Sequence, residues 1–228
     1  MASKDTQNPQ DQLSVENIND RLTVAGRQLA ENKKILYWML GIIVAVGICV
    51  VCYVFFYVNP RTSKSMEAYN NVEITALGND SVRAAGYKKV ADKFSGTPAG
   101  NVAALSAAEN LYEMGKYDEA VKYLKKFKTG DDVLMANAQI LLGDCYVNLK
   151  KYDDAISAFK KACNTADDNA QIEPRALLKM ANVYDAQKKY DKALDCYEEI
   201  LEDYPNFTLG NGLTIEAYAE RERARLGK

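Results

Sequence analysis

The two residues most suggestive of chemistry are Cys49 and Cys52, whose C-x-x-C spacing is that of redox-active dithiols. A reactive thiolate needs a polar, partly exposed setting, whereas this pair is flanked by the apolar runs "VGI" and "YVFF". We therefore assign no redox function to it. The other three cysteines, Cys145, Cys163 and Cys196, lie in segments with the apolar spacing of packed helices, which predicts buried free thiols.

The composition excludes several classes of enzyme. The 228 residues include no histidine, so Ser-His-Asp catalysis, Cys-His catalysis and histidine-ligated zinc are all absent. Neither a G-x-G-x-x-G nor a G-x-x-x-x-G-K-[ST] phosphate loop occurs. The 29 lysines and arginines are interspersed with 31 acidic residues, which leaves no basic stripe for nucleic acid. We expect no catalytic residue, metal, cofactor or small-molecule substrate, and an enzyme is the last function considered.

One segment has the length and composition of a membrane span. Residues 35–58 form 24 consecutive positions without a charge. As a helix they extend about 36 Å against about 30 Å of bilayer hydrocarbon, which predicts a transmembrane helix. A cleaved signal peptide fits less well, because the apolar run is too long, 34 residues precede it and no small-x-small site follows it. A lipoprotein signal fails because Ile48 and Val51, which are large, precede the two cysteines.

The charges that flank this segment predict its orientation. Close to its ends, four basic residues precede it and two follow it: Arg21, Arg27, Lys33 and Lys34, then Arg61 and Lys64. By the positive-inside rule, the N-terminus lies in the cytoplasm and the larger C-terminal part lies across the membrane. In a Gram-negative cell this describes a single-pass protein of the bacterial inner membrane with a periplasmic domain.

Small residues follow one face of the predicted span. Gly41, Ala45 and Cys49 are spaced by four, which lets a second helix approach closely. This stripe is a candidate docking site for a partner membrane helix. The alternative is that small residues are simply common in membrane helices.

The residues before the span, 1–34, are expected to form a cytoplasmic tail. Residues 1–13 are polar and lack the apolar content of a folded segment. From Ser14 onward, Ile18, Leu22, Ala25 and Leu29 form one stripe of a short amphipathic helix. This helix either binds a cytoplasmic partner or lies on the lipid surface as it leads into the span.

Three stretches of the chain are near copies of one another: "GKYDEAVKYLKKF", "KKYDDAISAFKKA" and "KKYDKALDCYEEI". Their shared tyrosines, Tyr117, Tyr152 and Tyr190, are 35 and then 38 residues apart. A period of roughly 34 residues is typical of a stacked helix-turn-helix repeat. The alanine three residues after each tyrosine falls where paired helices cross closely, because a larger side chain would separate them. The sequence therefore predicts an all-α solenoid.

These segments resemble the tetratricopeptide repeat family over residues 102–207. The family's small residue of the first helix falls on Ala108, Gly143 and Ala181, and its small residue of the second helix falls on Ala120, Ala155 and Ala193. The resemblance implies three repeats within 101–207. It also implies a curved stack whose first helices line a concave groove.

Two further parts of the solenoid are expected around the three repeats. Residues 59–100 would hold a juxtamembrane segment and a degenerate fourth helix pair, with helices around Met66–Leu77 and Ser81–Phe94. Residues 208–228 would hold a C-terminal capping helix. Its charges, "ERERAR", are expected to solvate the open end of the stack.

The groove of such a repeat domain is the candidate functional site, because it binds extended peptides or helices. The family's register places on that face Leu105, Glu109, Tyr112 and Glu113 of the first repeat, Ile140, Leu141, Asp144 and Val147 of the second, and Arg175, Leu178, Lys179 and Asn182 of the third. A groove that is apolar and mixed in charge favours hydrophobic polypeptide segments. The alternative is that neighbouring helices cover several of the apolar members.

Some relatives use lysine, asparagine and arginine side chains of this groove to hold the C-terminal carboxylate of a cytosolic chaperone. Arg175 and Lys179 are present here, but Leu105, Glu109 and Leu141 occupy the other positions of that clamp. The clamp function is therefore not carried over to this chain.

The overall plan resembles the YfgM-like ancillary subunits of the Sec translocon. The stretches "LAENKKILYWMLGIIVAVG" and "SMEAYNNV" carry this likeness, together with the order of tail, membrane helix and repeats. The resemblance implies an anchored, non-enzymatic scaffold or chaperone-like subunit. Its partners would be envelope polypeptides, the translocon and periplasmic folding factors. Two alternatives stay open: an outer-membrane assembly or cell-division scaffold, and an organelle import receptor with cytosolic repeats.

Overall fold

The computed structural model describes residues 33–166, 169–209 and 214–227, together with Thr23 and Gly26, and it divides after Pro60 into two units. The amphipathic helix expected in the tail otherwise lies outside the described residues. Within those residues every regular element is helical, which confirms the all-α prediction.

The first unit contains one long apolar helix. Helix α2 covers Lys33–Tyr53 and continues as a turn of π-helix, η1, over Val54–Val58. The backbone N–H of Asn59 donates to the carbonyl of Val54, five residues back. This wider turn directly precedes Pro60, the one residue here that has no N–H and cannot continue α-helical hydrogen bonding.

The helix is a candidate membrane span. The described chain has one helix that is long and apolar enough to cross a membrane, within Leu36–Ala76, and its most apolar window has a mean hydropathy of 2.8. That window is 0% buried inside the protein. Large side chains such as Trp38 and Phe56 are exposed along it, and they need an apolar environment other than the protein's own core.

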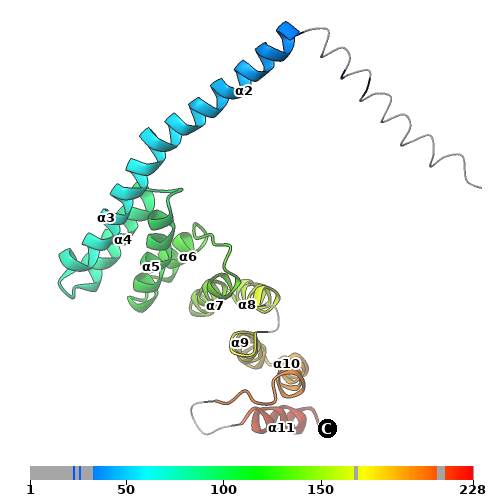
Figure 1. Cartoon of the computed structure of the whole chain (residues 1–228). Coiled ribbons are helices and arrows are strands. Elements are labelled where there is room, and N and C mark those ends of the chain that lie inside the picture. The colour runs from blue at the N-terminus through cyan, green and yellow to red at the C-terminus, as the bar shows by residue number, and fades with distance from the viewer. Residues whose placement is uncertain (1–22, 24–25, 27–32, 167–168, 210–213, 228) are drawn as a thin grey trace, which may run out of the picture. The chain divides into compact units, whose positions relative to one another are not determined.

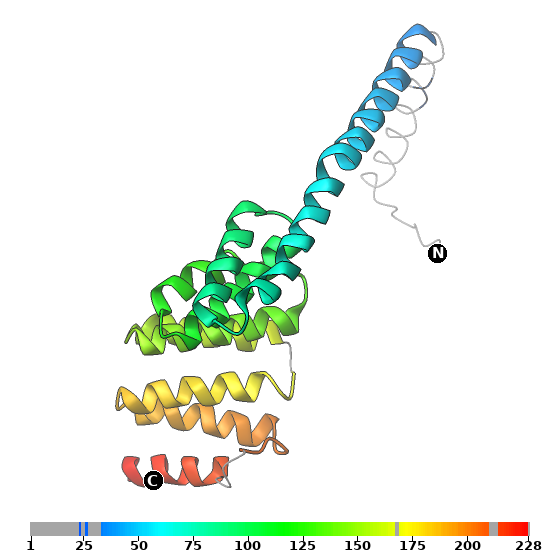
Figure 2. The same ribbon diagram turned by 90° about the vertical axis from the view of Figure 1, so that its left-hand side faces the viewer.

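The second unit begins at Arg61 and is a stack of helices (Figure 1 and Figure 2). Its members are α3 (Asn59–Ala76), α4 (Asp80–Lys93), α5 (Pro98–Glu113), α6 (Tyr117–Leu124), α7 (Asp132–Asn148), α8 (Tyr152–Ala166), α9 (Glu173–Ala186), α10 (Tyr190–Asp203) and α11 (Ile215–Leu226). From α4 to α11, each helix contacts the next one along the chain. This is the arrangement of a solenoid, in which each helix pair buries its apolar face against its neighbours.

The degenerate pair expected before the repeats is present as α3 and α4. Helix α3 begins at Asn59 rather than near Met66, because the backbone stays helical from η1 onward and no capping residue interrupts it. Helix α4 starts after Asn79, whose side-chain oxygen accepts from the N–H of Val82.

The turns within the three clear repeats share one conformation. Gly115, Lys150 and Lys188 have φ angles of 73°, 58° and 59°. Each lies two residues before the tyrosine that marks its repeat. The left-handed conformation suits glycine and costs another residue about 1 kcal/mol, so its recurrence at two lysines shows that the repeat geometry requires it.

The small residues of the repeats lie where helices approach most closely. Ala120, Ala155 and Ala193 are 0% exposed. Gly143 of α7 lies against the ring of Phe159 in α8, and a Cβ added to it would come within 2.3 Å of Phe159 Cε1. The ring is itself fully buried and has no room to move, so only glycine fits at this contact.

The three cysteines of the repeats are buried free thiols, as their positions predicted. Burial raises the pKa of Cys145, Cys163 and Cys196 to about 12 in each case. A thiol with such a pKa stays protonated at neutral pH and is a poor nucleophile. The repeats are therefore compatible with an oxidising compartment.

The last helix, α11, attaches to the stack through an ion network centred on one buried acid, Glu222. Glu222 is 0% exposed and accepts hydrogen bonds from Arg221 Nε at 2.7 Å and from Arg225 Nη1 at 3.1 Å. Both arginines also pair with Asp185 of α9. The expectation that "ERERAR" solvates the open end therefore needs one correction: Glu222 is buried, whereas the two arginines that join it to Asp185 stay partly exposed to solvent.

We predict that Gly143→Ala lowers the free energy of unfolding by about 1–3 kcal/mol, because the added methyl group must displace Phe159. Urea unfolding of the full chain in detergent, followed by circular dichroism, measures this. The matched control is Gly130→Ala, where a Cβ meets no atom within 4 Å. It should stay within about 0.5 kcal/mol of the parent. Equal effects of the two substitutions would contradict the packing argument.

We predict that Glu222→Gln loosens α11, because two arginines then lose the charge that they surround. The expected cost is about 1–3 kcal/mol. Hydrogen exchange measured by mass spectrometry should show faster exchange in α11 and unchanged exchange in α5. Glu220→Gln, at an exposed site on the same helix, is the control and should exchange like the parent. Unaltered exchange of α11 in Glu222→Gln would show that the network does not hold the helix.

Candidate peptide-binding groove

The first helices of the three clear repeats, α5, α7 and α9, line one cavity of about 400 Å³. Helix α5 begins after Thr97, whose hydroxyl accepts from the N–H of Gly100. Helix α7 begins after Asp131, whose carboxylate accepts from the N–H of Leu134. These caps fix where each helix starts, and the 3.6-residue period then fixes which side chains meet the cavity.

Most of the groove residues predicted from the sequence come together here. Seven line the cavity: Leu105, Glu109, Ile140, Leu141, Asp144, Arg175 and Lys179. Three further lining residues, Leu134, Asn137 and Ala138, were missed. They precede Leu141 on α7 by seven, four and three residues, so helical spacing extended one turn toward the N-terminus would have found them.

The other predicted groove residues lie outside this cavity. Tyr112, Val147 and Leu178 are half-buried and pack against the hydrophobic core. Asn182 and Glu113 are exposed near the C-terminal ends of their helices. The cavity therefore lies between Leu105 and Glu109 of α5, Leu134 and Asp144 of α7, and Arg175 and Lys179 of α9.

The apolar members divide into a floor and a wall. Leu105 is 9% and Ile140 5% exposed, so neighbouring helices cover most of both side chains. For these two residues the alternative considered from the sequence is correct. Leu134 is 38% exposed and Leu141 is half-buried, and these two residues offer the apolar surface that a ligand can reach.

Polar contacts hold α9 against α7 along the cavity. Lys179 Nζ lies 2.9 Å and 3.0 Å from the two carboxylate oxygens of Asp144. Arg175 donates to the side-chain oxygen of Asn137. Because these groups already satisfy one another, they act as fixed walls of the cavity.

Glu109 differs from these residues because it forms no ion pair within the described chain. Its pKa is raised, first because the surrounding protein removes water from the carboxylate and second because Glu113 lies nearby. A cationic group bound beside Glu109 would offset both effects. The cavity thus combines apolar surface with one uncompensated acid.

The small-residue stripe of the candidate span is also accessible. Ala45 and Cys49 line a shallow apolar depression of about 390 Å³ on α2. Gly41 lies outside that depression, and a Cβ added there would meet no atom within 4 Å. Docking of a partner helix on this stripe stays a prediction.

Comparison with known proteins identifies the repeats. Residues 134–206 match the family model described as tetratricopeptide repeat, and residues 89–162 match the model of anaphase-promoting complex, cyclosome, subunit 3. Two crystal structures of MamA align with TM-scores of 0.54 and 0.56, at 23% identity over 68% and 73% of this chain and 83% of each of theirs. The apo form of RapI aligns with a TM-score of 0.54, at 14% identity over 73% of this chain and 48% of that chain. These similarities establish the fold.

One curated relative matches part of the chain. The protein named ancillary SecYEG translocon subunit from Neisseria gonorrhoeae (strain ATCC 700825 / FA 1090) is 31% identical over 113 residues. The match covers 49% of this chain and 52% of the relative, so the chain spans about half the length of the curated relative that it matches. The chain contains tetratricopeptide repeats, a fold that binds protein partners, and about half of its length is similar to the protein named ancillary SecYEG translocon subunit.

Proposed function

We propose that this protein is a membrane-anchored scaffold that binds polypeptide segments in the groove of α5, α7 and α9, at or near the Sec translocon. The observation that carries the proposal is the convergence of seven predicted groove residues, from three helices distant in sequence, on one cavity. The unburied apolar helix α2 supports the anchor. The name of the curated relative supports the place of action.

The groove suits a segment that pairs an apolar side chain with a basic one. The apolar side chain would lie on Leu134 and Leu141, above the floor formed by Leu105 and Ile140. The basic side chain would meet Glu109, whose charge has no partner of its own in the described chain. Such segments occur throughout unfolded envelope polypeptides, which is the behaviour expected of a chaperone-like subunit.

The compartment follows from the charges around the span. An excess of basic residues just before the uncharged segment 35–58 supports a cytoplasmic N-terminus and a periplasmic repeat domain in the inner membrane. The raised thiol pKa values of the repeats are consistent with a periplasmic domain. Translocon subunits and periplasmic folding factors are the proposed partners in this compartment.

We predict that Leu134→Glu combined with Leu141→Glu weakens binding of an alkylated, permanently unfolded polypeptide about tenfold or more, or about 1.4 kcal/mol. The two substitutions replace the apolar side chains that a ligand can reach with carboxylates, and they leave the buried floor of the cavity unchanged. Fluorescence anisotropy with the full chain in detergent measures the affinity. The control is Val133→Glu, an exposed apolar residue beside Leu134 that does not line the cavity. If the variant and the control lose affinity equally, or if neither loses affinity, the polypeptide binds outside this cavity.

We predict that protease added to intact spheroplasts degrades the repeat domain, whereas protease added to inverted vesicles removes only the tail before α2. This follows from a cytoplasmic N-terminus. Immunoblots with tags at the two ends separate the products. The reverse pattern would contradict the periplasmic proposal and favour repeats in the cytosol, as in an import receptor.

A further inference from the structure

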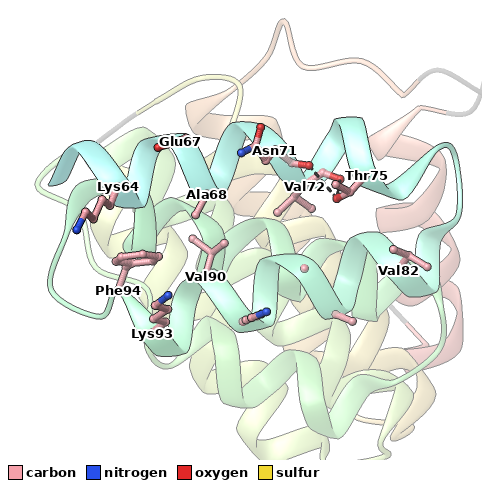
Figure 3. Close-up of a pocket in the computed structure, with 13 residues that line it drawn as sticks. Lys64, Glu67, Ala68, Asn71, Val72, Thr75, Val82, Val90, Lys93 and Phe94 are labelled. Carbon is pink, nitrogen blue, oxygen red and sulfur yellow. Dashed lines mark hydrogen bonds between the residues drawn. The ribbon is translucent and has the colours of Figure 1, made fainter. Parts of the chain in front are cut away.

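A second groove lies on the first helix pair of the stack, between α3 and α4 (Figure 3). It has a volume of about 610 Å³ and is lined wholly by residues of these two helices and of the turn that ends α4. We call it the α3–α4 groove. It shares no residue with the cavity of α5, α7 and α9, and the proposed function does not use it.

The shape of the α3–α4 groove fits a helix. On each of its two helices the lining residues recur at three and four positions, from Lys64 to Thr75 and from Val82 to Lys93. Each stripe covers eleven steps, or about 16 Å, which corresponds to about three helical turns. Figure 3 shows Val72 and Val90 directed into the space between the two helices. The groove is therefore a channel about three helical turns long between α3 and α4, with apolar residues along its middle and charged residues on its rim.

The two helices approach closely at the floor of this channel. A Cβ added to Gly86 would lie 2.8 Å from Val72 Cγ1, so the valine occupies the space that glycine leaves. Ala68 of α3 and Ala85 of α4 widen the channel beside this contact. Larger side chains at these positions would fill the channel.

The groove is the open end of the stack. Tyr69 of α3 contacts Ser106 of α5, and Lys88 of α4 pairs with Glu119 of α6, and none of these four residues lines the groove. The next helices therefore cover other faces of α3 and α4. At the far end of the stack, α11 lies as a single helix against α10. A helix bound in the α3–α4 groove would extend the stack at its near end in a comparable way.

The rim of the groove is positively charged. Lys64, Lys89 and Lys93 line it with a single acid, Glu67. Within the described chain none of these three lysines forms an ion pair, whereas Lys88 of the same helix is paired across the stack. Lys64 and Lys93 gather with the ring of Phe94 at one end of the groove (Figure 3). The rim thus repels a basic helix and attracts an acidic one.

We infer that the α3–α4 groove is a docking site for an acidic amphipathic helix of a partner protein. The apolar face of that helix lies on Ala68, Val82 and Ala85, which line the groove and are not buried. Val72 and Val90, each 5% exposed, form the buried floor beneath it. Its flanking carboxylates pair with Lys64, Lys89 and Lys93. This mode is helix-in-groove recognition, in which apolar anchors supply affinity and rim charges select the partner. It is separate from capture of unfolded segments in the α5, α7 and α9 cavity.

The test uses two fluorescent designed peptides of about 20 residues, long enough to form a helix. Both carry one alanine and leucine face, and their flanks carry glutamate in one peptide and lysine in the other. Anisotropy is measured with the full chain in detergent. The glutamate peptide should bind, the lysine peptide should not, and binding should weaken as salt rises from about 50 to 500 mM.

Two variants identify the site. Ala85→Arg fills the channel at an exposed position and should abolish binding of the glutamate peptide. Reversal of three charges, Lys64→Glu with Lys89→Glu and Lys93→Glu, should weaken it about tenfold or more. The control reverses three exposed lysines of later repeats, Lys122→Glu with Lys161→Glu and Lys188→Glu, and should bind like the parent.

Four outcomes would overturn the inference. Equal binding of the two peptides would show that the rim charges do not select the partner. Unchanged binding of the glutamate peptide by Ala85→Arg would show that the peptide binds outside the α3–α4 groove. If the peptides do not bind, but the chain associates with itself and Ala85→Arg disrupts that association, the occupant is a second copy of the chain. If the peptides do not bind, but phosphatidylglycerol vesicles do and the three-charge reversal abolishes that binding, the occupant of the α3–α4 groove is lipid. The double variant Leu134→Glu with Leu141→Glu should still bind the glutamate peptide, so failure of either proposal is distinguishable from failure of the other.

Discussion

The stack depends on side chains small enough for the backbones of the two helices within one repeat to approach each other. Ala120, Ala155 and Ala193 are fully buried at these crossings. Gly143 is the tightest case, because the ring of Phe159 occupies the volume that any side chain would need. Where these contacts form, the helices of successive repeats stack in register, and every surface feature of the unit follows from that stacking.

The two helices of each repeat have different roles, one in packing and the other in lining the cavity. The second helices and their tyrosine turns recur almost unchanged along the chain, because they form the packing and adopt the same left-handed turn. The first helices vary, since one side of each is left to line the cavity. Ion pairs such as Lys179 with Asp144 then join α9 to α7 across that side and keep the cavity open. Binding surface is thus a consequence of packing, and its chemistry is set by residues that packing leaves free.

At each end of the stack, one helix face has no further repeat to cover it, and the two ends differ in what covers that face. At the C-terminal end, α11 covers α10 and secures itself with Glu222, two arginines and Asp185. At the N-terminal end, α3 and α4 leave an apolar channel with unpaired lysines on its rim. The apolar lining residues that solvent reaches there, Ala68, Val82 and Ala85, are the surface that a bound helix would cover.

The sequence by itself determined the helical class, the repeat register, the apolar segment and most residues of the groove. These properties depend on local periodicity and on side-chain size, which a single chain displays directly. Tertiary structure alone decided which groove residues a ligand can reach: Leu105 and Ile140 became the floor, because burial depends on the helices that pack around them. It also buried Glu222 of α11 in an ion network, because Asp185, the partner of its two arginines, lies in α9, far away in the sequence. The open channel of α3 and α4 was equally beyond sequence reasoning, since its emptiness depends on which faces the rest of the stack covers.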